Sequence, residues 1–305
     1  MSDNVSTDLS NGTGQAAGGD SGRQVWFITG SSRGLGRALA TAALEAGDLV
    51  VATARRPETL TETFAAYGER MLPLALDVTD PQAARRAVDA AVGRFGRIDV
   101  LVNNAGYANV APVESADDAD FRAQFETNFW GVYNVTKAAL PTLRHQGFGT
   151  VVQFSSIGGR VGGSPGIASY QAAKFAVDGF SRVLATEAAP FGVRVMVVEP
   201  SGFATDWAGA SMTVHDIPEA YDATVGEMNR RVRQSTAGAA GDPRRAAEII
   251  VRTVHRTEVP SHLPLGVDAA SMALDHSRHQ TAEATTWEKV SRSADFGEPY
   301  PVELP

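Results

Sequence analysis

Short apolar segments alternate with Ala-rich amphipathic segments from Gln24 onward, and no other feature of the sequence restricts the fold as much. Amphipathic stretches over about residues 81–94, 117–145 and 170–189 are predicted to be helices. The intervening segments are apolar almost throughout, as in strands buried on both faces of a parallel sheet: QVWFIT, DLVVATA, RIDVLVNN, TVVQFSS and VRVMVVEP. We therefore predict a single α/β domain over residues 23–305, a doubly wound parallel sheet with helices on both faces.

The two ends of the chain differ from this pattern. Residues 1–22 are rich in Gly, Ser, Asp and Asn and carry almost no large apolar side chain, so we predict a disordered tail. A helix is predicted from about 243 to 256, and the segment SHLPLGVD is predicted to add a strand. The remaining residues, about 268–305, form a predicted C-terminal extension that begins as an Ala-rich helix.

Composition excludes several classes of function. The formal net charge of the 305 residues is −8 at pH 7, so the chain lacks the excess of basic residues with which proteins bind nucleic acids. It has no cysteine, which removes disulfides, thiolate nucleophiles and thiolate metal ligands. No run of about 18 apolar residues and no signal-peptide pattern occur. We expect a cytoplasmic protein that binds neither membranes nor nucleic acids and needs no metal.

A glycine-rich turn, Thr29 to Gly36, follows the first predicted strand and leads into a helix. In such a turn the backbone N–H groups and the helix N-terminus can bind the pyrophosphate of a dinucleotide. The glycines follow the spacing GxxxGxG rather than the GxGxxG of the general dinucleotide fingerprint. The alternative is a turn whose glycines serve only to pack the helix on the strand. The position between strand and helix favours cofactor binding.

Further motifs follow in chain order, each after a predicted strand or in a predicted helix. They are Asp77-Val78, Asn103-Asn104-Ala105-Gly106, Asn128 in TNFWG, Ser155-Ser156, Tyr170 with Lys174, and Pro200-Ser201-Gly202. Together with the glycine turn they resemble the motifs of the short-chain dehydrogenase/reductase family, in its non-extended branch, over about residues 24–207. The resemblance implies a Rossmann-like fold, hydride transfer between a nicotinamide cofactor and a small-molecule carbonyl or alcohol, and a homo-oligomer, either dimer or tetramer.

The resemblance also implies which residues act. The catalytic set would be Asn128, Ser156, Tyr170 and Lys174. Ser156 would bond the substrate oxygen, Lys174 would also bind the nicotinamide ribose, and Asn128 would hold a water that links Lys174 to solvent. Cofactor contacts would come mainly from the ends of successive strands: Gly30, Ser32, Arg33, Gly34, Leu35, Gly36, Arg55, Asp77, Val78, Asn104, Ala105, Gly106, Tyr170, Lys174, Pro200, Gly202, Phe203 and Thr205.

The spacing of Tyr170 and Lys174 agrees with this chemistry. Residues four apart are neighbours on one face of a helix. A tyrosine titrates near pH 10 in water, which is too high for efficient acid/base catalysis at neutral pH. A neighbouring ammonium favours the phenolate, so we expect Lys174 to lower the pKa of Tyr170. Tyr170 would then donate a proton to a carbonyl oxygen during reduction, or accept one from an alcohol during oxidation.

Two positions depart from the family pattern. Ser156 and Tyr170 are 14 positions apart, one more than we expect, with the extra residue in the segment 162–165. We choose Ser156 because a Gly-rich loop can absorb one residue; Ser155 is the alternative, and the two face opposite sides because successive strand residues do. The second departure is Ser201, where the family usually has glycine. A serine would be strained there if the position requires a positive φ.

The residues after the second strand indicate which nicotinamide cofactor is bound. NAD sites place a carboxylate there for the ribose 2′-OH, whereas NADP sites place a cation for the 2′-phosphate. This chain has Ala54 followed by Arg55 and Arg56, and Arg33 in the glycine turn adds a further guanidinium. A guanidinium binds two phosphate oxygens at once. The alternative is that these arginines are only solvated. We predict that NADP(H) is preferred and that NAD(H) remains possible.

Residues 203–240 follow the predicted strand VRVMVVEP, where the family has its mobile substrate lid. Phe203, Trp207, Met212 and Tyr221 could line an apolar pocket there, or could equally pack against the body. The histidines do not occur at metal-ligand spacing, and we assign no role to His215, His255, His262, His276 or His279.

A protein that binds the dinucleotide without turnover, as a sensor or scaffold, is the alternative to an enzyme. Such proteins usually lack the tyrosine or the lysine, and both are present here. An epimerase or dehydratase of the extended branch would require GxxGxxG spacing, which this chain lacks. The identity of the substrate does not follow from the fold.

Overall fold

The computed structural model describes residues 22–205, 212–236 and 241–305, with side chains except for those of residues 233–236. Residues 1–21 of the predicted N-terminal tail, and Trp207, lie outside these ranges. Seven parallel strands form one sheet in the order β3-β2-β1-β4-β5-β6-β7, so the predicted fold class is confirmed. The strands are β1 Val25–Ile28, β2 Leu49–Ala54, β3 Met71–Ala75, β4 Val100–Asn103, β5 Gly149–Phe154, β6 Val193–Pro200 and β7 His262–Leu265.

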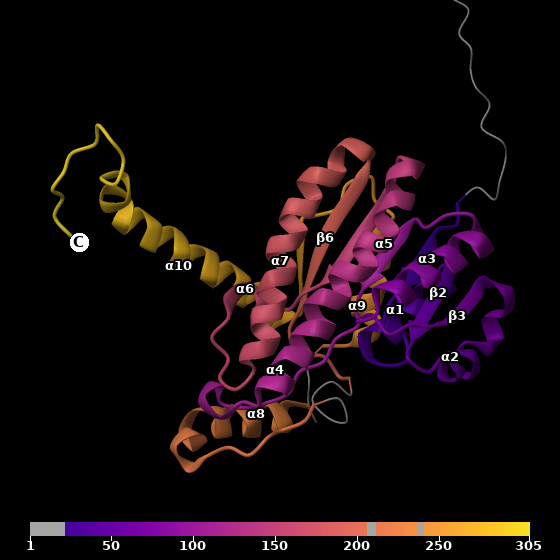
Figure 1. Ribbon diagram of the computed structural model, residues 1–305, viewed down its shortest axis with the longest axis horizontal. Coiled ribbons are helices and arrows are strands. Elements are labelled where there is room, and N and C mark those ends of the chain that lie inside the picture. Colours follow the sequence, from indigo (N-terminus) through magenta and orange to yellow (C-terminus); the bar gives the residue numbers. More distant parts are fainter. Residues whose placement is uncertain (1–21, 206–211, 237–240) are drawn as a thin grey trace, which may run out of the picture.

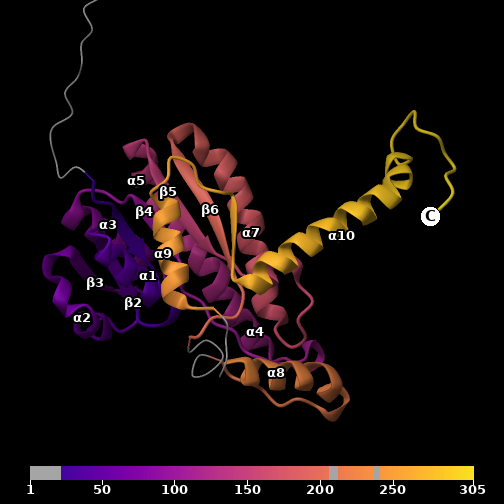
Figure 2. The ribbon, with the colours of Figure 1, turned by 180° about the vertical axis from the view of Figure 1, so that it is seen from behind.

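Helices cover both faces of the sheet, as predicted. Figure 1 shows α5 and α7 in front of the strands, and Figure 2, from behind, shows α9 in front of them. Side chains of β1 alternate between two cores, with Trp26 and Ile28 in one and Phe27 in the other. The helices are α1 Gly34–Glu45, α2 Glu58–Thr63, α3 Pro81–Phe95, α4 Asp118–Phe125, α5 Gly131–Gln146, α6 Gly158–Val161, α7 Ala168–Ala188, α8 Glu227–Thr236, α9 Pro243–Val254 and α10 Val267–Arg292.

Local signals in the sequence explain where α3 begins and ends. The Asp80 carboxylate caps the helix by accepting hydrogen bonds from the N–H groups of Gln82 and Ala83. Pro81 occupies the first turn, where its missing N–H costs nothing. Gly96 ends the helix in the left-handed conformation, with φ of 80°.

The long helix predicted over residues 117–145 is interrupted. A π-helical turn, Glu126–Trp130, separates α4 from α5, and Asn128 lies within it. Such turns are frequent at functional sites because they displace one residue from the regular helical surface. Shorter 3₁₀ segments cover Ala65–Arg70, Val113–Ser115, Ala189–Phe191 and Glu219–Tyr221, and a second π-helical turn covers Asp222–Gly226.

The predicted C-terminal extension is mostly the helix α10, which projects away from the body in both views (Figures 1 and 2). Of its residues only Ala269 and Ala273 are buried, and they pack against Ile157 after β5. No helix among the described residues is long and apolar enough to cross a membrane.

Candidate active site

The crevice between the loops after β1 and β4 is where the strand order reverses and where ligands of doubly wound sheets bind. The Asn104 side-chain amide donates hydrogen bonds to the carbonyl oxygens of Thr29, at 3.0 Å, and Gly30, at 3.2 Å. The Thr29 hydroxyl oxygen accepts from the backbone N–H groups of Asn104 and Ala105. These bonds hold the glycine turn and the NNAG segment in fixed positions relative to each other.

The start of α1 has the properties of an anion site. The helix begins at Gly34, no described side chain caps it, and its first turn carries no acidic residue. Its first N–H groups are therefore available to a ligand. A Cβ at Gly36 would lie 2.3 Å from the Gly30 carbonyl oxygen, so only glycine permits this turn, and Thr205 lies beside Gly34. The predicted pyrophosphate-binding residues thus fit the group.

The arginines predicted to select the cofactor are exposed. Neither Arg33 nor Arg55 forms an ion pair with a carboxylate in the described part of the chain. Burial and the Asp120 carboxylate raise the pKa of the Tyr107 hydroxyl in the loop after β4, and the Arg55 guanidinium opposes part of this rise. Asp77 is exposed and its carboxylate accepts hydrogen bonds from Thr79.

Gly106 connects two of the predicted catalytic residues. A Cβ at this glycine would lie 2.4 Å from Oδ1 of Asn128 and 3.5 Å from Nζ of Lys174. The Asn128 amide also donates to the carbonyl oxygens of Tyr107 and Gln124, each at 2.8 Å, and accepts from the Tyr107 N–H. The fully buried Asn128 side chain therefore fixes the loop after β4 next to Lys174.

Lys174 is buried, and its ammonium donates a 2.7 Å hydrogen bond to the carbonyl oxygen of Phe154 at the end of β5. The Nζ atom lies 5.6 Å from the centre of the Tyr170 ring. Burial lowers the pKa of Lys174 to about 8, because the charged form loses its hydration.

Tyr170 differs from our expectation. Burial raises the pKa of its hydroxyl to about 12, and the polar side chain of Ser156 beside it opposes part of this rise. We expected Lys174 to lower the pKa below its usual value. Desolvation of the phenolate is the larger effect here, since the lysine ammonium bonds to the backbone at Phe154 rather than to the phenol oxygen.

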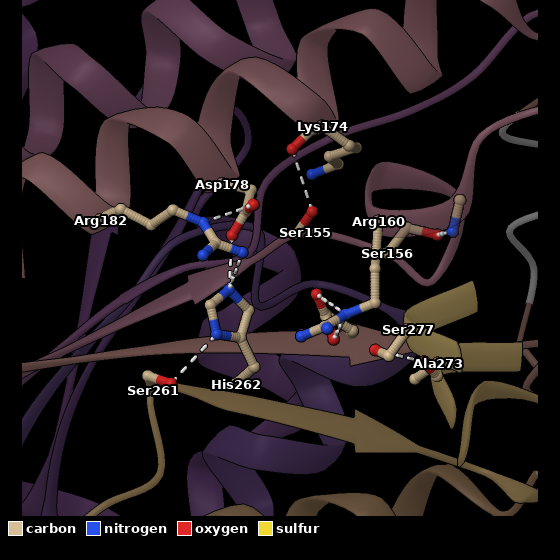
Figure 3. Close-up of polar contacts among 12 residues, drawn as sticks. Ser155, Ser156, Arg160, Lys174, Asp178, Arg182, Ser261, His262, Ala273 and Ser277 are labelled. Atoms are coloured by element: carbon tan, nitrogen blue, oxygen red, sulfur yellow. Dashed lines mark hydrogen bonds and ion pairs between the residues drawn. The ribbon is translucent and has the colours of Figure 1, made fainter. Parts of the chain in front are cut away.

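The two serines after β5 face opposite ways. Ser156 lies beside the Tyr170 hydroxyl, whose pKa it lowers, and its Oγ accepts from the Gly158 N–H at 3.1 Å. Ser155 is buried, and its hydroxyl donates to the backbone carbonyl oxygen of Lys174 at 3.0 Å (Figure 3). The longer loop before Tyr170 therefore leaves Ser156 beside the tyrosine.

Ser201, Gly202 and Phe203 come directly after β6, the strand that pairs with β5 in the sheet. The Ser201 hydroxyl donates to the carbonyl oxygen of Leu265, which gives this serine a partner that a glycine would lack. Gly202 and Phe203 line a cavity of about 180 Å³ together with residues of α9 and α10. None of the four predicted catalytic residues lines this cavity.

Two groups of ion pairs, centred on the buried Glu199 and on Asp178, join α6, α7, β6 and β7 near Lys174 (Figure 3). Arg160 of α6 binds both carboxylate oxygens of Glu199, at 2.9 and 3.0 Å, and Glu199 is 1% exposed. Asp178 of α7 pairs with His262 of β7 at 2.5 Å and with Arg182 at 2.9 Å. Oxygen and nitrogen atoms of Asp178, Glu199 and His262 lie within 4.8 Å of one another, but guanidinium groups already bind both carboxylates.

Sequence reasoning missed the partners of the histidines. His215 contacts Asp120 at 3.2 Å, His255 contacts Asp48 at 3.0 Å, and His262 contacts Asp178. No spacing in the sequence indicates these pairs, because the partners lie 84 to 207 positions apart. Of the predicted lid residues, Tyr221 donates a hydrogen bond to Glu114.

Comparisons with known proteins identify the family to which the chain belongs. The family model described as short chain dehydrogenase matches residues 24–214. Oxidoreductase BOA17 of Botryotinia fuckeliana is 49% identical over 269 residues, which cover 88% of this chain and 98% of that protein. A short-chain dehydrogenase from Streptomyces avermitilis has a solved structure with a TM-score of 0.83 and 39% identity, covering 90% of this chain and 99% of its own.

A third relative is a 3-ketoacyl-(acyl-carrier-protein) reductase from Brucella melitensis, solved in complex with NADH. It matches with a TM-score of 0.64 and 26% identity, over 79% of this chain and 95% of its own. The family match covers well over half of the chain and contains the glycine turn, the NNAG segment and the Tyr170–Lys174 pair. This chain belongs to the short-chain dehydrogenase/reductase family of oxidoreductases.

Proposed function

We propose that this protein interconverts a small-molecule carbonyl and the corresponding alcohol with NADP(H) as the preferred cofactor, and that Tyr170 exchanges the proton with the substrate oxygen. The observation that carries the proposal is that Ser156 lies beside the Tyr170 hydroxyl, close enough to lower its pKa, and that Lys174 and Asn128 both lie beside Gly106. The hydroxyls of Ser156, just after β5, and of Tyr170, in α7, can therefore both bond one substrate oxygen.

The electrostatics favour proton donation by Tyr170. With a pKa of about 12, its hydroxyl stays protonated at neutral pH and can donate to a carbonyl oxygen. Negative charge then develops on the phenol oxygen, and the Lys174 ammonium, 5.6 Å from the ring centre, stabilises that charge. Ser156 bonds the same substrate oxygen and holds it in position. Bound NADP(H) supplies or accepts the hydride.

The cofactor preference follows from charge. β2 ends at Ala54 without a carboxylate, and Arg33 and Arg55 are exposed near the crevice. The Ser31 N–H donates to the carbonyl oxygen of Thr53 at 2.9 Å, which ties the glycine turn to the end of β2. The two guanidinium groups therefore extend from loops that are held together, as a site for a ribose 2′-phosphate requires.

The alternative, a dinucleotide sensor or scaffold without turnover, has no observation in its favour, because Tyr170, Lys174, Ser156 and Asn128 are all present and adjacent. By resemblance to the family we also propose a homo-oligomer. Absorbance of NADPH and of NADH during incubation with a panel of ketones, aldehydes and alcohols tests the function. Turnover with NADPH and a higher kcat/KM than with NADH is the expected result; binding of both cofactors with no turnover on any substrate would support the sensor instead.

A further inference from the structure

Part of the segment that follows β6 pairs with the loop after β4 through backbone hydrogen bonds. We use the name lid segment for its described part, residues 212–226. The Val110 N–H donates to the carbonyl oxygen of Thr213 at 2.8 Å, and the His215 N–H donates to that of Val110 at 2.9 Å. Val110 belongs to the loop after β4, so the lid segment is attached to the loop that carries the NNAG motif.

A second contact involves the loop between Ser156 and Tyr170. A Cβ at Gly166 would lie 2.7 Å from a methyl carbon of Val225 and 3.0 Å from one of Val110, and its φ is 86°. Val225 and Val110 are both buried. Three segments that are distant in sequence therefore meet at this glycine: the lid segment, the loop after β4, and the loop that precedes α7.

The Asp120 carboxylate, near the start of α4, connects these segments by polar contacts. It accepts from the Asn109 side chain at 2.7 Å and from the Gln124 side chain at 3.0 Å, and it contacts the His215 ring at 3.2 Å. Asn109 in turn accepts from the Thr213 N–H at 3.0 Å. Hydrogen bonds that share members in this way strengthen one another.

The same cluster leads to Asn128. The Gln124 side chain accepts from the Asn109 N–H at 2.9 Å, and the Gln124 carbonyl oxygen accepts from the Asn128 amide at 2.8 Å. Asn128 also bonds both backbone groups of Tyr107, two residues before Asn109. Gln124 therefore connects Asp120 to Asn128 directly within the helix, and the loop segment from Asn109 to Tyr107 connects them a second time.

We propose that Asp120 is a positioning residue that fixes two parts of the active site at once. Through His215 and Asn109 it holds the lid segment, and through Gln124 and Asn109 it holds the loop that surrounds Asn128. An isolated exposed ion pair contributes little. Asp120 differs because three side chains converge on it and its side chain is only 24% exposed. The catalytic consequence rests on the function proposed above.

Substitutions of His215 remove the contact between Asp120 and the lid segment and leave the contacts of Asp120 with Asn109 and Gln124 in place. His215→Phe keeps the size of the ring but removes the contact with Asp120, so the KM for the carbonyl should rise about tenfold while kcat stays within about threefold, as for a lost binding contact. His215→Gln should restore KM because its amide can donate to Asp120. His279→Phe, at an exposed position of α10, is the matched control and should leave both constants unchanged.

Asp120→Ala should raise KM and also lower kcat by about tenfold. The side chains of Gln124 and Asn109 lose their acceptor, so the groups that hold Asn128 in place are no longer fixed. Hydrogen exchange of the amides of residues 110 and 213–215 gives a readout that does not depend on turnover. Exchange should be faster in His215→Phe and near the wild-type rate in His215→Gln. Unchanged KM and unchanged exchange in His215→Phe would overturn the proposal.

The exchange experiment also separates this inference from the proposed function. If the wild type reduces no carbonyl in the panel, the proposed function fails. The exchange rates of the His215 variants then still decide whether Asp120 holds the lid segment.

Discussion

Ser156 lies beside the hydroxyl of Tyr170, whereas its neighbour Ser155 donates to the backbone of Lys174 on the other side of the same strand end. Adjacent serines of identical chemistry thus have different partners, because successive residues of a strand point to opposite faces. The pair offers an internal control for the role of each hydroxyl.

Ser156→Ala should lower kcat by about 100-fold, the usual cost of removing one group that bonds the reacting oxygen. Ser155→Ala removes a buried hydrogen bond instead and should lower the free energy of unfolding by about 1 kcal/mol with kcat close to wild type. Steady-state kinetics and urea denaturation of both variants check this pair. If kcat fell more in Ser155→Ala than in Ser156→Ala, Ser155 and not Ser156 would be the serine that bonds the substrate oxygen.

Tyr170→Phe should reduce kcat by at least about 100-fold, because general acid–base catalysis contributes about 10²–10⁴ and only the proton donor is removed. The dissociation constant for NADPH, measured by fluorescence titration, should stay within a few fold. Retained turnover in this variant would show that another group donates the proton.

Lys174→Met should change how the free energy of unfolding depends on pH, because the buried Lys174 has a lowered pKa. The pKa of Lys174 is about 8 in the folded chain and its ordinary value is 10.5, so between these values the unfolded chain binds the extra proton. The stability of the wild type should therefore rise with pH relative to Lys174→Met, by about 2 kcal/mol from pH 7 to pH 9.5. Urea denaturation at both pH values measures the difference; a constant difference would mean that Lys174 keeps its ordinary pKa.

The double substitution Ala54→Asp and Arg55→Gln places a carboxylate at the end of β2 and removes a guanidinium. A charge-assisted hydrogen bond contributes about 1.5–3 kcal/mol, so the ratio of kcat/KM for NADPH over NADH should fall at least about tenfold. The ratio in the wild type is measured first. If the wild type prefers NADPH and the double variant keeps the same ratio, other residues bind the phosphate.

Glu199→Gln should destabilise the chain by about 3 kcal/mol, because it leaves the Arg160 guanidinium without its buried counter-charge. Glu199→Leu combined with Arg160→Met removes both charges and should recover most of this loss. Thermal or urea denaturation of the single and double variants gives the comparison. A double variant as unstable as the single one would indicate that the pair itself stabilises the fold.

The sequence alone determined the order of strands and helices, because each buried strand and each amphipathic helix carries its own periodic pattern. The apolar runs predicted β1, β2, β4, β5 and β6, and the segment SHLPLGVD predicted β7, whereas no run was identified for β3. The capping residues Asp80 and Gly96 are visible at the ends of α3. The motifs also lie at predictable places, since the carboxyl ends of parallel strands meet at one edge of the sheet.

Relationships between distant residues depended on the tertiary structure. The choice between Ser155 and Ser156, the pKa of Tyr170 and the partners of Asp120 and His215 could not be read from spacing. Burial decides whether an ionised group keeps its hydration, and only the packing of the whole chain determines burial. Long-range hydrogen bonds have no periodic signature, because their two partners are separated by many residues and come from independent elements. The order of elements was therefore set by local patterns, and the chemistry of the site by packing.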